Sequence, residues 1–81
     1  MDKNEDIKAQ IKRLDNALCG DPGNADLYFE RGKLLWKIGN RGGAITDFNM
    51  AVGLDPASGA QAYLEMANSI MDFYNTDLYN P

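Results

Sequence analysis

The strongest constraint on the fold is a self-similarity with a period of 34 residues. Under that shift residues 17–22, Ala-Leu-Cys-Gly-Asp-Pro, align with residues 51–56, Ala-Val-Gly-Leu-Asp-Pro, and Leu14 aligns with Phe48. A fixed period of this size is typical of stacked supersecondary units, each of which buries its apolar face only against its neighbours. A chain of 81 residues holds about two such units and forms one domain.

The spacing of apolar residues indicates that these units are helical. Ile7, Ile11, Leu14 and Leu18 follow the helical period, and the residues between them are mostly polar. The predicted helices span residues 5–19, 25–38, 43–54 and 58–75, all within one domain of residues 1–75 that precedes a tail of residues 76–81. No alternating apolar and polar run is long enough for a strand, so the fold class is all-α, with antiparallel helix–turn–helix order.

Glycine and proline set the predicted boundaries. Gly20 is expected to form a left-handed cap, and Pro22 cannot continue the first helix. Gly39 ends the second helix, which is apolar around much of its girth and should lie centrally. The third helix begins with Gly43, and because a helical glycine costs up to about 1 kcal/mol relative to alanine, its first turn is expected to fray.

The same periodicity predicts which faces are buried. The third helix should bury Ala44, Ile45, Phe48, Ala51, Val52 and Leu54. The fourth repeats apolar residues at Ala62, Tyr63, Met66, Ile70, Phe73 and Tyr74. Its polar face carries Gln61, Glu65, Asn68 and Asp72. Because repeat arrays need a solvated face on their last unit, the fourth helix is predicted to be a cap.

Residues 25–58 resemble one complete tetratricopeptide repeat. The resemblance is carried by Tyr28, Gly32, Leu35 and Gly39 in the first helix of the pair and by Ala44, Phe48, Ala51 and Pro56 in the second. Two departures stand out: Arg31 replaces the usual leucine, and residues 41–43 replace the usual aromatic and acidic start. The flanking helices resemble half repeats, so the resemblance implies a small solenoid with one complete repeat between two halves.

Composition excludes most enzymes. The chain has no His and a single Cys, which removes the usual ligands of zinc and the usual bases of catalytic triads. No catalytic constellation is found, and no cofactor or metal is expected. Residues 42–81 carry five acidic and no basic residues, and the net charge of −4 argues against nucleic acid as a partner.

No apolar run reaches the length of a membrane span or a signal sequence. The lone Cys19 is compatible with a reducing compartment. We therefore expect a cytoplasmic protein that contacts no membrane.

The resemblance places a concave groove on the first helices of the repeats. Its predicted lining is Phe29, Lys33, Trp36, Lys37, Tyr63, Ala67 and Ile70, with Asp26, Met71 and Tyr74 beside them. The functional hypothesis is a scaffold for protein–protein contacts, in which aromatic side chains bury an apolar anchor of a peptide and the lysines attract its carboxylate. The alternative for these residues is that the aromatics complete a small core and the lysines are solvated.

A second hypothesis is a structural module that forms a homodimer without a dedicated peptide ligand. The tail also has two interpretations, since Asp77, Leu78 and Tyr79 supply the carboxylate and the apolar side chains that the groove is expected to bind. It is either a frayed end or a segment that folds back over the groove.

Overall fold

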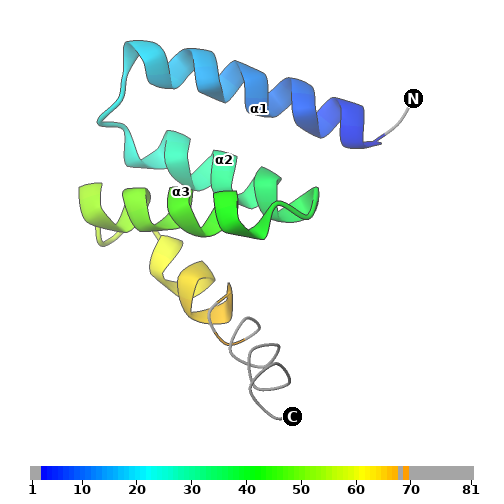
Figure 1. Cartoon of the computed structure of the whole chain (residues 1–81). Helices are drawn as coiled ribbons and strands as arrows, with labels where there is room; N and C mark the ends of the chain where they lie inside the picture. The colour runs from blue at the N-terminus through cyan, green and yellow to red at the C-terminus, as the bar shows by residue number, and fades with distance from the viewer. Residues whose placement is uncertain (1–2, 68, 70–81) are drawn as a thin grey trace, which may run out of the picture.

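The computed structural model describes residues 3–67 and 69. Three long helices follow one another: α1 (Lys3–Gly20), α2 (Ala25–Lys37) and α3 (Arg41–Leu54). A fourth helix spans residues 60–67 and is coloured yellow to orange in Figure 1. No strand occurs in these described residues, so the all-α prediction is confirmed at the level of packed helices.

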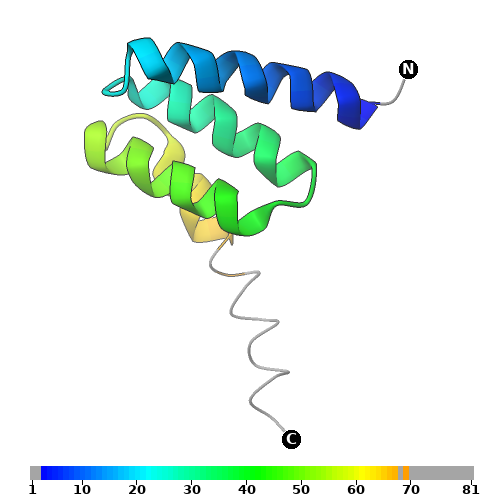
Figure 2. The same cartoon turned by 45° about the horizontal axis from the view of Figure 1, so that its top comes forward.

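Successive helices run in opposite directions and lie side by side, with α2 between α1 and α3 (Figures 1 and 2). The central position predicted for the second helix is therefore present. In both views α1 extends past the end of α2. Its 18 residues have a length of about 27 Å, against about 20 Å for the 13 residues of α2.

The turns differ in how they end the helices. Gly39, with φ of +89°, adopts the left-handed conformation after α2, as expected. Gly20 does not: it is the last residue of α1 and its φ is not positive, so the predicted left-handed cap there is wrong. The turn after α1 is closed instead by backbone bonds, from the Asp21 N–H to the Leu18 carbonyl at 3.3 Å and from the Asn24 N–H to the Asp21 carbonyl at 3.2 Å.

α3 begins at Arg41, two residues before the predicted start. Asn40 is its N-cap: the side-chain oxygen accepts from the Gly43 N–H at 3.0 Å, and the Asn40 carbonyl accepts from the Ala44 N–H at 3.0 Å. The Thr46 hydroxyl also donates to the Gly42 carbonyl at 3.1 Å. The two glycines are thus held in a capped first turn, which is the opposite of the frayed start predicted from their intrinsic preference.

The core lies between α2, α3 and the fourth helix. Its buried members are Ala25, Ala44, Phe48, Ala51, Ala60 and Leu64, with Tyr28, Phe29, Leu35, Trp36 and Tyr63 packed around them. Gly32 permits the close approach of α2 to α3, because a Cβ atom there would lie 2.7 Å from the Phe48 ring. Leu54, predicted to be buried, is 44% exposed, since it ends α3 beyond the reach of α2.

The buried face of the fourth helix differs from the predicted one. Ala60, Leu64 and Ala67 are buried, whereas Ala62 and Met66 are exposed. The helix begins at residue 60, behind the Gly59 turn (φ +93°), rather than at residue 58. Gln61 and Glu65 are exposed and bonded to each other at 3.3 Å. The polar residues Asn68 and Asp72, and the predicted helix beyond residue 69, lie outside the described residues.

Candidate functional site

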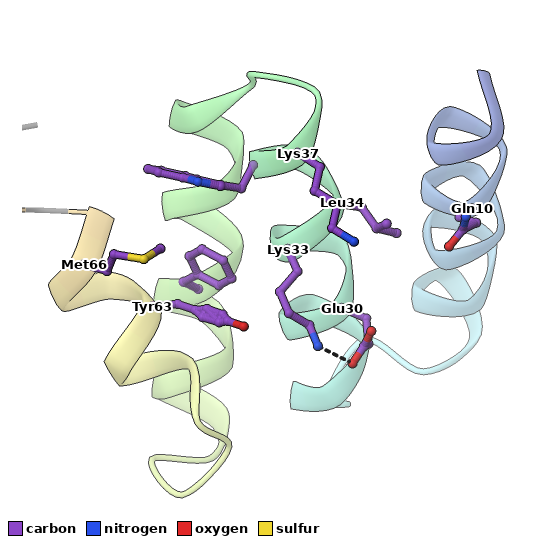
Figure 3. Close-up of a pocket in the computed structure, with 9 residues that line it drawn as sticks. Gln10, Glu30, Lys33, Leu34, Lys37, Tyr63 and Met66 are labelled. Carbon is purple, nitrogen blue, oxygen red and sulfur yellow. Dashed lines mark ion pairs between the residues drawn. The ribbon is translucent and has the colours of Figure 1, made fainter. Parts of the chain in front are cut away.

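An open pocket of about 500 Å³ lies over α2, between α1 on one side and the fourth helix on the other. The residues lining it are Gln10, Glu30, Lys33, Leu34, Trp36, Lys37, Phe48, Tyr63 and Met66. Figure 3 shows Tyr63 and Met66 on the wall formed by the fourth helix and Gln10 across from them on α1. The pocket therefore collects side chains from every helix described.

Four of the seven predicted groove residues line this pocket: Lys33, Trp36, Lys37 and Tyr63. Phe29 does not line the pocket, but its ring contacts the Tyr63 ring edge-on, with the centroids 5.2 Å apart. Ala67 is completely buried and does not line the pocket. Ile70, Met71, Tyr74 and the tail of residues 76–81 lie outside the described residues.

The aromatic floor of the pocket is built by packing between three helices. The rings of Phe29, Phe48 and Tyr63 pack mutually edge-to-face, with centroid separations of 5.2 to 6.1 Å. Phe48 is 1% exposed, and Tyr63 and Trp36 are half-buried. Edge-to-face packing of this kind fixes ring orientation, so the exposed part of Tyr63 is held in place by Phe29 and Phe48.

The two lysines of the pocket differ in whether they pair with a carboxylate of the described residues. Lys33 Nζ lies 3.0 Å from Glu30 Oε1 and 4.6 Å from the centre of the Phe29 ring, and its side chain is 32% exposed. Lys37 is exposed and forms no salt bridge with any other described residue. The prediction treated the two as an equivalent basic pair, but a glutamate one turn away already pairs with the first.

A third cation of this region was not predicted. The Arg41 guanidinium lies over the Trp36 ring, 5.3 Å from its centre. It comes from the capped first turn of α3, where the sequence pattern indicated a frayed end. Cation–π contacts of this geometry stabilise an aromatic ring in a fixed orientation.

Arg31 is the other charged group that sequence reasoning missed. Its Nε and Nη2 donate to the two carboxylate oxygens of Asp47 at 2.7 and 2.8 Å, and Nη1 donates to Asp15 Oδ1 at 2.8 Å. The hydrogen bond to Asp47 raises the pKa of Arg31 above its ordinary value, burial lowers it, and the bond to Asp15 raises it again. The guanidinium therefore keeps its charge at every pH below that ordinary value and joins α1, α2 and α3.

The signal for this network was in the sequence. Arg31 stands where the repeat pattern has leucine, and Asp47 is the one acidic residue of α3. Asp47 is 3% exposed, which is possible because both of its oxygens accept from Arg31. Arg31 in place of leucine and the lone carboxylate of Asp47 next to Phe48 are thus the two members of one partly buried ion pair.

In residues 3–67 and 69, no three side chains of the types His, Cys, Asp and Glu lie close enough together to hold a metal ion. Over the same residues, no helix has the length and apolar character needed to cross a membrane. Cys19 is exposed near the end of α1 and forms no disulfide.

No known protein family has a model that matches the sequence, and the chain has no significant match among solved structures.

Proposed function

We propose that this chain is a small, non-catalytic scaffold of the tetratricopeptide type that binds a peptide segment of a partner protein. The observation that carries the proposal is the open pocket in which Trp36, Tyr63 and Met66 meet. Met66 is 45% exposed although it borders the aromatic floor. Partly exposed aromatic and methionine side chains around one concavity are the usual composition of an anchor site.

The charge around the pocket favours an acidic ligand. Lys33 and Lys37 line it, and Glu30 is the single carboxylate among the described lining residues. The proposed ligand is a peptide with one aromatic or leucine anchor and a nearby carboxylate. The proposed compartment is the cytoplasm, because Cys19 is exposed and has no second cysteine with which to pair.

Trp36 provides the test, because it is the only tryptophan of the chain and it lines the pocket. The probe is a seven-residue peptide, blocked at both ends, with Asp-Leu-Tyr at its centre. Titration of the full chain should give a saturable change in Trp36 fluorescence, and the affinity for the peptide should be lower in high salt. A flat titration up to the solubility limit of the peptide would contradict the proposed function.

A matched pair of variants tests where the peptide binds. Met66→Ser removes apolar surface from the wall of the pocket and should weaken binding about 3–10-fold. Met50→Ser is the control, because Met50 is 43% exposed on α3 and does not line the pocket. Equal losses in the two variants would place the peptide elsewhere.

A second candidate function is self-association, which is favoured by two exposed apolar residues on α3. Met50 and Leu54 lie one turn apart and are 43% and 44% exposed. Sedimentation across a concentration series, with Leu54→Ser as the variant, tests this candidate. A single monomeric species from micromolar to near-millimolar concentration would exclude it.

A further inference from the structure

Within the described part of the chain, only one of the two pocket lysines is paired with a carboxylate, so the two ends of the pocket differ in charge. The inference rests on the proposed function, because it concerns which lysine binds the carboxylate of a bound peptide. Lys33 is held between the Glu30 carboxylate at 3.0 Å and the Phe29 ring at 4.6 Å, and Figure 3 shows its side chain directed toward Glu30. A ligand carboxylate can pair fully with Lys33 only by competing with Glu30 for the same ammonium group.

The environment of Lys37 differs. It lies one turn further along α2, its side chain is exposed, and no carboxylate of the described residues lies within ion-pair distance of it. The neighbouring residue Trp36 carries the Arg41 guanidinium over its ring at 5.3 Å. The ammonium group of Lys37 is therefore available to a ligand at an end of the pocket that Trp36 also lines, whereas the positive charge of Lys33 is neutralised by Glu30.

We infer that Lys37 binds the carboxylate of an acidic peptide whose aromatic anchor lies against Trp36 and Tyr63. Glu30 already pairs with Lys33 and so keeps the peptide carboxylate from binding there. Glu30 is then a specificity-determining residue, since it fixes the end of the pocket at which the ligand's negative charge binds. The anchor is aromatic because the pocket offers it ring edges and a methionine sulfur, both of which make favourable contacts with a ring.

The test uses the full chain and two probes: the blocked seven-residue peptide with Asp-Leu-Tyr at its centre and the same peptide with Asn in place of Asp. The ratio of their dissociation constants, measured from Trp36 fluorescence, is the readout. We expect the Asp peptide to bind about 2–5-fold more tightly at low salt, as is typical of a partly exposed ion pair.

The variants separate the two lysines. Lys37→Met should reduce the ratio to about one, and Lys33→Met should leave it unchanged, because methionine keeps apolar contact with Phe29 while removing the charge. Lys12→Met on α1 is the control for the change in net charge. Circular dichroism verifies that each variant keeps its helical content.

Glu30→Gln provides the converse test. It frees Lys33, so the ratio should rise about 2–3-fold. Glu5→Gln is its matched control, since Glu5 forms the same i,i+3 pair with Lys8, at 3.9 Å, away from the pocket. Both substitutions change the formal net charge from −4 to −3, so a global electrostatic effect would appear equally in the two.

The outcomes are distinct. A ratio that falls with Lys33→Met but not with Lys37→Met would overturn the inference, as would equal losses from the two variants or equal gains from Glu30→Gln and Glu5→Gln. In each of these cases both peptides still bind, so the proposed function stands. Failure of both peptides to bind the unmodified chain contradicts the proposed function itself and the inference with it.

Discussion

α2 packs against two neighbours in different ways. On the side of α3, Gly32 lies directly against the Phe48 ring, and Ala44 and Ala51 are completely buried. On the side of α1, the apolar stripe of Ile7, Ile11 and Leu14 is only half-buried, and Leu18 is the one buried residue of that helix.

The difference shows that helical periodicity determines which face of a helix is apolar, but not how tightly that face packs against its neighbour. Small residues let two helices approach until their side chains interlock, whereas long aliphatic residues facing a single partner leave space between the helices. The space here is a second hollow of about 260 Å³ between α1 and α2, lined by Gln10, Arg13, Leu14, Glu30 and Leu34. We expect the α2–α3 side to open last and α1 to detach first.

Truncation of Phe48 should have the largest effect on stability. Phe48→Ala removes a ring that is 1% exposed and contacts both Phe29 and Tyr63, so we expect a loss of about 3–5 kcal/mol in the free energy of unfolding. Leu14→Ala, on the looser side, should cost about 1–2 kcal/mol because its side chain is already half in water. Urea denaturation measures both, and equal losses would show that the two sides are packed alike.

The Arg31 network should show the same asymmetry. Arg31→Leu leaves the Asp47 carboxylate buried without its partner, and the expected cost is about 3 kcal/mol. Asp15→Asn, on the α1 side, should cost less than about 1 kcal/mol, because Asp15 is 52% exposed.

The double variant Arg31→Leu with Asp47→Leu distinguishes a buried charge from lost packing. Replacing both members of a buried ion pair by apolar residues is often close to neutral, so it should recover most of the stability. Thermal melts of the three variants measure the effect. A double variant as unstable as Arg31→Leu would show that stability is lost because the ion pair is absent, and not because the Asp47 carboxylate is left unpaired.

The close approach at Gly32 gives a smaller prediction. Gly32→Ala places a methyl group 2.7 Å from a Phe48 ring carbon and 3.3 Å from the Ala44 carbonyl oxygen, so α2 and α3 must separate, at a cost of about 1–3 kcal/mol. Gly53→Ala is the control, because its Cβ would meet nothing within 4 Å, and it should be neutral or stabilising by about 0.5–1 kcal/mol. A neutral Gly32→Ala would mean that the interface can widen freely.

The smallest effects are expected at the first turn of α3. Gly42→Ala projects into open space and should stabilise by about 0.5–1 kcal/mol. Gly43→Ala would place a Cβ 2.9 Å from the Asn40 side chain that caps the helix, and we expect a loss of about 0.5–1 kcal/mol. The sequence pattern alone predicts a neutral or favourable Gly43→Ala, so stabilisation by both substitutions would restore that expectation and argue against the cap.

Much of the fold follows from local rules. The helical period of apolar residues determines where helices form. Pro22, the left-handed Gly39 and Pro56 mark the three turns that separate them. These signals are readable in the sequence because each depends on residues within one or two turns of one another. The same local rules gave an incorrect start for α3, since the Asn40 cap outweighs the intrinsic preference of two glycines.

The candidate site was predictable only in part. The aromatic and basic residues of α2 lie on one helical face, so their grouping follows from spacing, but the exposure of Met66 and the burial of Ala67 depend on how the fourth helix is rotated about its axis. Several positions of that helix carry apolar residues, and periodicity alone does not choose between neighbouring faces.

The amino-acid sequence by itself determined that this protein is helical, that its helices alternate in direction and that α2 is the central one. Helical spacing already places Glu30 one turn from Lys33, but only the tertiary structure decided that Arg31 and Asp47 form one partly buried pair and that Met66 stays exposed while Ala67 is buried. The physical reason is that contacts between helices depend on side-chain rotamers and on how residues such as Arg31 and Asp47, which are 16 positions apart in the sequence, are brought together, and local preference does not specify this.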